Sequence, residues 1–264
     1  MGLFFCPLFS GSSGNATFIA TEDTAILVDA GVSCKRIGQA LENVEAKFSD
    51  LSAVIITHEH IDHIKAIGVM ARRHGVPIYA NEGTWSKIME QGRVGEIPME
   101  QRICFDRDFF IGDLAITPMA IPHDAAQPVG FSIYGGGVRV LSATDMGYMP
   151  KQVLAAASGA DIIMMEFNHD VHMLQNGAYP HYLKKRILSR HGHLSNDDAA
   201  IALKSLVDNG SRRFMLGHLS KENNTPEAAY DSACAAASDC GATVGVDVEI
   251  EVAPPVGPGK AFIL

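Results

Sequence analysis

The feature that most constrains the fold of this chain is a dense cluster of histidines and acids directly after a short apolar run. Val54-Ile55-Ile56 is apolar and β-branched, which is typical of a buried strand. The next run, Thr57-His58-Glu59-His60-Ile61-Asp62-His63, brings three histidines and an aspartate within six residues. Imidazole nitrogen and carboxylate oxygen are ligands that suit Zn²⁺ and similar divalent ions. A chance cluster on a solvated loop is the alternative, but the position at the end of a buried strand favours a metal site.

The spacing inside this cluster predicts that its members face two different ions. Side chains two positions apart in an extended segment point the same way, so His58 and His60 can share one ion. Asp62 and His63 lie at the following turn and can face a second ion.

The rest of the chain alternates predicted strands and helices, which is typical of a sheet-containing α/β sandwich. No repeat, low-complexity tract or linker divides the sequence, so we expect a single domain over residues 1–264. The predicted strands are residues 2–9, 16–20, 25–29, 53–57, 76–80, 115–120, 129–134, 138–142, 162–167 and 213–217. The predicted helices are residues 35–41, 61–73, 150–158, 182–188, 196–209 and 226–238. Residues 253–264 are rich in Pro and Gly with an apolar end, and the sequence leaves open whether they are docked or frayed.

Composition limits the compartment and the partners that we expect for this chain. No apolar run approaches the roughly 20 residues that span a bilayer, so we expect no membrane partner. The five cysteines are odd in number and scattered, without a C-x-x-C pair, which indicates a reducing, cytoplasmic compartment. The net charge of −9 means that a polyanionic substrate would need a local basic patch or the metal ions themselves.

The pattern His-x-His-x-Asp-His resembles the signature of the metallo-β-lactamase superfamily, and further motifs resemble that family in the same order. Ile26-Leu27-Val28-Asp29-Ala30-Gly31 resembles the first motif, whose aspartate supports the ligand loop. Later motifs are represented by His123 in Ile121-Pro122-His123-Asp124, by Asp145 in Ser142-Ala143-Thr144-Asp145, and by His218 in Leu216-Gly217-His218. The resemblance implies a metallo-β-lactamase fold, an αββα sandwich, with two divalent metal ions (Zn²⁺ or Mn²⁺) as cofactors. It also implies the ligand sets, which are His58, His60 and His123 for one ion, Asp62, His63 and His218 for the other, and Asp145 as the bridge.

The identity of the bridging residue bears on the reaction. True metallo-β-lactamases tend to have Cys where Asp145 stands, so antibiotic hydrolysis is not expected. Paired ions about 3.5–4 Å apart suit in-line displacement at phosphorus, because they clamp both the attacking and the leaving oxygen. A bound divalent ion lowers the pKa of water to about 7, so a metal-bridging hydroxide is the expected nucleophile for a phosphodiester.

A narrower resemblance is to the YycJ/WalJ group, small bacterial metallo-β-lactamase-fold proteins related to the RNase Z and RNase J nucleases. It implies a 5′→3′ DNA exonuclease, with nucleic acid as the substrate and DNA favoured over RNA. The oligomeric state, the native metal and the role of His169 are not predicted. The runs that carry the resemblance are residues 10–15, 57–63, 78–82, 168–170, 186–189, 192–196 and 218–224.

Three residues are candidates for catalysis within this resemblance. His193 matches a histidine that faces the scissile phosphate in RNase Z-like enzymes, as leaving-group acid or charge stabiliser. Glu166 resembles the acidic partner that orients it, and Asp62 is both a ligand and a catalytic candidate. Ser195, two residues after His193, is explained as a helix N-cap. Lys184-Lys185-Arg186 is either a solvated helix face or the local basic patch that an acidic nuclease requires.

Several alternatives use the same ligands. A small-molecule phosphodiesterase, for example one acting on cyclic phosphates, stays open because only 72 residues separate Asp145 from His218, too few for a large nucleic-acid-gripping insertion. A thioester hydrolase of the glyoxalase II type would lack residues 192–196. A redox di-iron enzyme is disfavoured because such sites usually have Glu where His60 stands. A non-catalytic regulatory partner is the other class, although all seven ligand positions are filled.

Overall fold

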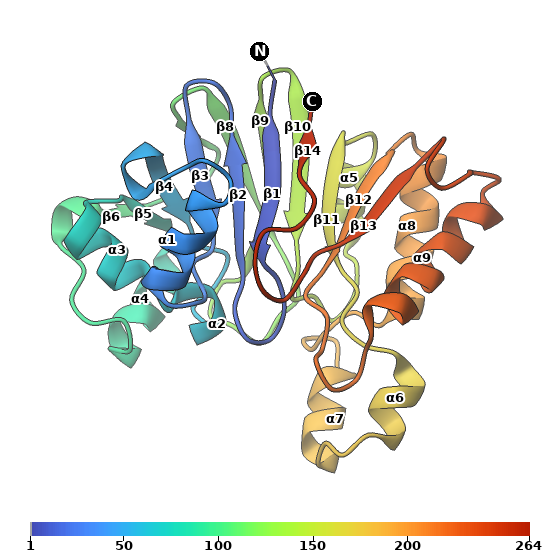
Figure 1. Ribbon diagram of the computed structural model, residues 1–264. Coiled ribbons are helices and arrows are strands. Elements are labelled where there is room, and N and C mark those ends of the chain that lie inside the picture. The colour runs from blue at the N-terminus through green and yellow to red at the C-terminus, as the bar shows by residue number, and fades with distance from the viewer. Residues whose placement is uncertain (1) are drawn as a thin grey trace.

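Two seven-stranded sheets pack face to face between layers of helices in the computed structural model, which describes residues 2–264 (Figure 1). The first sheet has the order β14 (Phe262–Ile263), β1 (Phe4–Phe9), β2 (Ala16–Ala20), β3 (Ala25–Val28), β4 (Leu51–Ile55), β5 (Ile78–Ala80) and β6 (Arg102–Cys104). The second has the order β13 (Glu249–Val252), β12 (Arg213–Gly217), β11 (Ile162–Glu166), β10 (Val138–Ala143), β9 (Val129–Gly135), β8 (Leu114–Ala120) and β7 (Phe109–Ile111). The predicted αββα sandwich of the α/β class is thereby confirmed.

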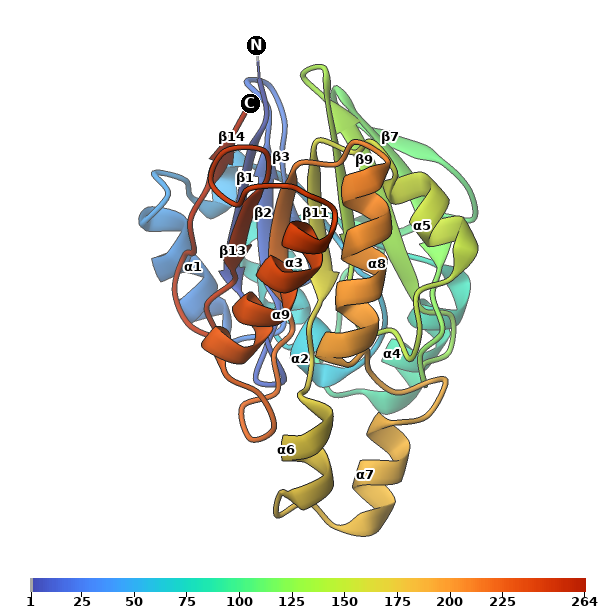
Figure 2. The same cartoon turned by 90° about the vertical axis from the view of Figure 1, so that its right-hand side faces the viewer.

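Most strands are apolar on both faces because both faces are covered, whereas β7, β8 and β9 at one side of the second sheet expose residues such as Phe110 and Tyr134. Phe5 and Ile26 of the first sheet pack against Phe131 and Val140 of the second, all of them fully buried. On the outer face of the first sheet lie α1 (Cys34–Glu42), α3 (Ile67–His74) and α4 (Glu82–Gln91). On the outer face of the second lie α5 (Lys151–Ala157), α8 (Asn196–Asp208) and α9 (Pro226–Asp239) (Figure 2). Strands buried on both sides explain the continuous apolar runs in the sequence.

The parallel strands direct their carboxyl-terminal loops to one end of the sandwich. In the first sheet β3, β4 and β5 run parallel, and in the second β10, β11, β12 and β13 do so. The short helix α2 (Ile61–Ile64) follows β4 at this end, where α6 (Val171–Asn176) and α7 (His181–Ile187) also project as a helical hairpin (Figures 1 and 2). The carboxyl ends of parallel strands are where α/β proteins usually bind ligands.

The single helix predicted over residues 61–73 is wrong, because the structure divides it into α2 and α3. In an uninterrupted helix the N–H of Ala66 would bond to the carbonyl of Asp62. That carbonyl instead accepts the N–H of Asn15 at 2.8 Å, and Ala66 donates to the carbonyl of Ala30 at 2.9 Å. Tertiary hydrogen bonds therefore end α2 early and turn α3 onto the sheet.

The C-terminal segment, left open by the sequence, is docked. Strand β14 pairs antiparallel with β1, and the N–H of Leu3 donates to the carbonyl of Leu264 at 2.8 Å. The prediction missed α4, α6, β6, β7 and β13, together with the short 3₁₀ helices η1 (Phe48–Asp50) and η2 (Met99–Gln101). Within residues 2–264, none of the helices has the length and apolar character needed to cross a membrane.

Candidate metal centre

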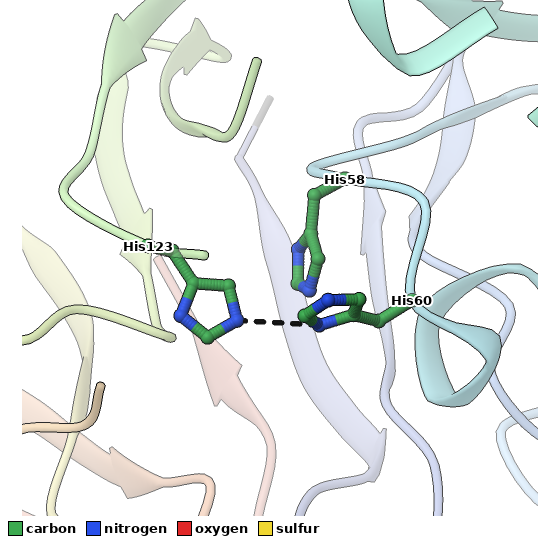
Figure 3. Close-up of side chains that lie close together, drawn as sticks. All are labelled: His58, His60 and His123. Carbon is green, nitrogen blue, oxygen red and sulfur yellow. Dashed lines mark hydrogen bonds between the residues drawn. The ribbon is translucent and has the colours of Figure 1, made fainter. Parts of the chain in front are cut away.

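Three histidines from two distant parts of the sequence meet at the end of the sandwich. His58 and His60 follow β4, whereas His123 follows β8 from the other sheet. Nε2 of His123 lies 3.3 Å from Nδ1 of His60, and the ring of His58 lies 4.6 Å from that of His60 between centroids (Figure 3). Their candidate ligand atoms all lie within 4.8 Å of one another, which fits one metal ion. We call these three residues the imidazole group.

A second set lies beside the first. Asp62 Oδ2 is 3.7 Å from His63 Nε2 and 4.0 Å from Nε2 of His218, which follows β12. The candidate ligand atoms of these three residues also lie within 4.8 Å of one another, which fits one ion. We call them the carboxylate-backed group, because buried carboxylates stand behind both of its histidines.

Asp145, at the end of β10, lies between the two groups. Its Oδ2 is 3.5 Å from His63 Nε2, and its Oδ1 is 3.9 Å from His123 Nε2. The residue has φ of 64°, a left-handed conformation that is uncommon outside glycine. Asp29 and His218 share this conformation, at φ of 64° and 56°. Such backbone strain gathers at functional sites, and here it turns three strand-end side chains toward one centre.

Unsatisfied buried atoms show that this centre fits cations. Nε2 of His58, Nε2 of His218 and Oδ2 of Asp145 are buried and have no hydrogen-bond partner among the residues that the structure describes. Leaving such atoms unpaired costs about 1–3 kcal/mol each, and more for a charged group. All three belong to the predicted ligand set, so divalent ions would satisfy them together.

Asp29 supports the loop that carries His58, His60, Asp62 and His63 through hydrogen bonds. Asp29 Oδ2 lies 2.7 Å from His63 Nδ1 and accepts the hydroxyl of Thr57 at 2.8 Å. Gly31 lets this loop approach, because a Cβ there would lie 1.5 Å from the carbonyl oxygen of Asp62. Burial opposes a charge on His63, but Asp29 and the other carboxylates outweigh it and raise the pKa of His63 to about 10. The centre therefore stabilises positive charge.

Glu166, at the end of β11, holds two histidines at once. Its Oε1 lies 2.7 Å from Nδ1 of His193 and 3.1 Å from Nδ1 of His218, while its Oε2 accepts the N–H of Met146. Burial would raise the pKa of Glu166, but the two imidazoles lower it to about 2. Burial likewise opposes a charge on His218, whose pKa is nevertheless raised to about 9 by Asp145 and by Glu166. The structure brings the predicted pair together and adds a contact with His218 that was not expected from the sequence.

The chain around His193 is fixed by α7. The N–H of His193 donates to the carbonyl of Ile187 at 3.0 Å, and a Cβ on Gly192 would lie 2.1 Å from the same oxygen. Only glycine lets the backbone pass this close. Ser195 caps α8, as expected, by accepting the N–H of Asp198. His169 is buried outside the candidate ligand groups, and its carbonyl accepts the N–H of Asn196, so it helps to hold this segment.

A cavity of about 230 Å³ opens beside the centre, and one residue of the predicted basic run Lys184-Lys185-Arg186 lines it. Arg186 lines the cavity and pairs with Asp124 through both Nε (2.5 Å) and Nη2 (3.0 Å). Lys184 instead donates to the carbonyl of Gln175, and Lys185 is exposed and outside the lining. Of the three residues, Arg186 is therefore the one at the mouth of the site.

Sequence reasoning also missed Asn15. Its Nδ2 lies 3.0 Å from Nε2 of His63, and its Oδ1 accepts the N–H of Gly11. The Gly-rich turn between β1 and β2 is thus tied to the metal centre. The only sequence signal was its place in that turn, which is shared by many loops without function.

The fold and the site define a class of protein. Residues 24–219 match the family described as Beta-lactamase superfamily domain, and the chain belongs to this family. It is a metal-dependent hydrolase, with His and Asp clusters that suit divalent ions.

The chain is also similar to individual proteins of known sequence or structure. The chain is 38% identical over 263 residues, 98% of each chain, to a protein of Bacillus anthracis named Exodeoxyribonuclease YycJ. It is 38% identical over 252 residues to Exodeoxyribonuclease WalJ of Streptococcus pneumoniae, covering 95% of this chain and 94% of the relative. The structure of YhfI from Bacillus subtilis matches over all of both chains with a TM-score of 0.75 and 19% identity. Human tRNase Z, short form, matches 84% of this chain and 93% of its own with a TM-score of 0.59 and 16% identity. These two structures bear on the fold alone.

Proposed function

We propose that this protein is a two-metal exodeoxyribonuclease that hydrolyses DNA in the 5′→3′ direction. The observation that carries the proposal is the position of Asp145, whose carboxylate lies between two groups that each suit one ion. The names of the YycJ and WalJ relatives support DNA as the substrate. The free thiols of all five cysteines support a reducing compartment, and we place the protein in the cytoplasm.

We assign the proposed ligands to two ions according to the distances between them. The imidazole group would hold one ion, the carboxylate-backed group would hold the other, and Asp145 would contact both. When bound, two divalent ions, Zn²⁺ or Mn²⁺, would acidify a water molecule and stabilise negative charge on a phosphodiester. Asp62, whose side chain is 26% exposed and lines the cavity, is the ligand carboxylate best placed to orient that water.

His193 and Glu166 would complete the reaction at the leaving group. Glu166 occupies Nδ1 of His193, so Nε2 is the nitrogen left to face a substrate in the cavity. The contact with Glu166 fixes the orientation of the His193 ring. Nε2 of His193 can therefore give its proton to the sugar oxygen that departs from phosphorus, a role typical of general acid catalysis.

The direct test offers substrates of different class to one preparation. Single- and double-stranded DNA labelled at either end, RNA and cyclic dinucleotides should be incubated with Mn²⁺- and Zn²⁺-loaded protein. We expect stepwise release of nucleotides from the 5′ end of DNA, and no release by Asp145→Ala. Turnover of cyclic dinucleotides without digestion of DNA would instead identify a small-molecule phosphodiesterase. No turnover of any substrate would identify a non-catalytic partner.

A further inference from the structure

One face of the projecting α7 segment is turned toward the metal centre. Tyr179, Leu183 and Ile187 are spaced four residues apart and all line the cavity of about 230 Å³. Residues at this spacing share one face of a helix, and the face begins with Tyr179 just before the helix starts. Tyr182, by contrast, is 75% exposed and does not line the cavity. The hairpin of α6 and α7 therefore presents an aromatic and aliphatic surface to the site and a different tyrosine to solvent.

The rest of the same cavity is polar. Asp62, Asp145 and His193 line it from the metal centre, and Ser12 and Ser220 bring hydroxyl groups from two separate loops. A volume of about 230 Å³ is small beside pockets that hold drug-sized ligands. A flat, partly apolar group with polar edges, of about the size of one nucleoside, suits such a space.

A second pocket of about 210 Å³ adjoins the first and differs from it in its lining. The two share His60, Asp62 and Arg186, so the metal centre lies at their junction. The second pocket adds Arg93 and, in contrast to the first, is not lined by His193. The guanidinium groups of Arg93 and Arg186 line this side beside the carboxylates of Glu59 and Asp62, whereas the first pocket carries the aromatic ring. Arginine side chains are frequent partners of backbone phosphates.

We propose that the first pocket binds the 5′-terminal nucleoside of the DNA strand, with Tyr179 stacked on its base. The remaining strand leaves through the second pocket past Arg186 and Arg93. This inference rests on the proposed nuclease function. Stacking on an aromatic ring suits every base, so the pocket selects a strand end without selecting a sequence.

The position of His193 sets the polarity. In hydrolysis the oxygen of a water molecule bonds to phosphorus as the water releases a proton to solvent, the bond from phosphorus to the 3′ oxygen breaks, and that oxygen takes a proton from His193. The departing 3′ oxygen belongs to the nucleoside on the His193 side, which is the first pocket. The phosphoryl group stays on the shortened strand, whose new 5′ end can then enter the same pocket.

The test uses a single-stranded oligonucleotide with 2-aminopurine as its 5′-terminal base and a phosphorothioate at the first linkage to slow cleavage. Zn²⁺-loaded protein should quench this fluorescent base by stacking, and a matched probe labelled at the 3′ end should not be quenched. Tyr179→Ala should abolish the quenching and weaken binding by about fivefold or more, the lower end of what one stacked base contributes. Tyr179→Phe, which keeps the ring, and Tyr182→Ala, which removes an exposed tyrosine from the same segment, should both quench like the wild type.

Quenching that persists in Tyr179→Ala, or that is lost equally in Tyr182→Ala, would overturn the inference. Equal quenching of probes labelled at the 5′ and the 3′ end would overturn it as well. The proposed function fails separately, if the metal-loaded wild type releases no nucleotide from DNA. The fluorescence measurement still decides whether Tyr179 binds a terminal base in that case, because it requires no cleavage.

Discussion

The two ligand groups of the metal centre differ in the groups that contact the Nδ1 atoms of their histidines. In the imidazole group, His58 Nδ1 meets the hydroxyl of Thr57 at 3.0 Å, and His123 Nδ1 meets the carbonyl of Gly192 at 3.2 Å. In the carboxylate-backed group, His63 and His218 meet the buried carboxylates of Asp29 and Glu166. The Nδ1 atoms of His58 and His123 therefore meet neutral partners, whereas those of His63 and His218 meet charged ones.

The pKa values of these histidines shift in opposite directions in the two groups. Burial, reinforced by the neighbouring imidazole of His63, lowers the pKa of His58 well below its usual value, and burial lowers that of His123. In the other group the carboxylates outweigh burial and raise the pKa of His63 and of His218. A carboxylate behind a ligand histidine increases its basicity and fixes its orientation. We therefore expect the carboxylate-backed group to bind its ion more tightly than the imidazole group.

Loss of the residue between the groups should have the largest effect. Asp145→Ala should abolish turnover and release at least one ion, because its carboxylate lies against histidines of both groups. Assay of DNA digestion and elemental analysis of the purified variant measure the two effects. Asp231→Ala, which removes an exposed aspartate of α9, is the control. Activity within a factor of about ten of the wild type, or about 1.4 kcal/mol of barrier, would contradict a bridging role.

His193→Ala should have the next largest effect, and it separates catalysis from metal binding. His193 shares Glu166 with the ligand candidate His218, but its own contacts place it toward the substrate cavity. Turnover of DNA should fall by about 10²–10⁴-fold while both ions stay bound. The loss should shrink on a nitrophenyl phosphodiester, whose leaving group is stable without a proton. Equal losses on both substrates would indicate charge stabilisation at phosphorus, and no loss on either would make His193 structural.

Asp29→Asn tests the carboxylate-backed group directly. Asparagine tolerates the left-handed backbone of this position, so the change removes the charge behind His63 with little strain. Affinity for one ion should fall by about 10–100-fold, while the other ion is little affected. Competition with a chelator of known affinity measures both constants. Equal weakening of the two ions would show that the groups are not supported independently.

Thr57→Val should have the smallest effect of this series. The hydroxyl of Thr57 lies 3.0 Å from Nδ1 of His58 and also donates to Asp29 at 2.8 Å. Its loss removes the neutral hydrogen bond behind His58 and leaves the carboxylate of Asp29 in place behind His63. A neutral hydrogen bond contributes about 0.5–1.5 kcal/mol, so one binding constant should weaken about threefold to tenfold. The same chelator competition provides the comparison. An effect as large as that of Asp29→Asn would contradict the distinction between neutral and charged support.

The sequence predicted the site better than the elements around it, for physical reasons. Four of the seven proposed ligands lie in one short run, so their proximity is local, and the remaining three each follow the end of a predicted strand. The break between α2 and α3 was hidden, because it depends on Asn15 taking the carbonyl of Asp62 from across the chain. The docking of β14 and the second contact of Glu166 depend on tertiary structure in the same way. The roles of the ligands in binding metal stay predictions.

The central claim is that this site works with two ions, and metal stoichiometry tests it most directly. Protein freed of metal by chelation should be titrated with Zn²⁺ or Mn²⁺ while bound metal and DNA digestion are measured on the same samples. We predict two ions per chain at saturation, bound in two steps, with full activity reached only when the second ion binds. Saturation at one ion per chain with full activity would contradict the claim.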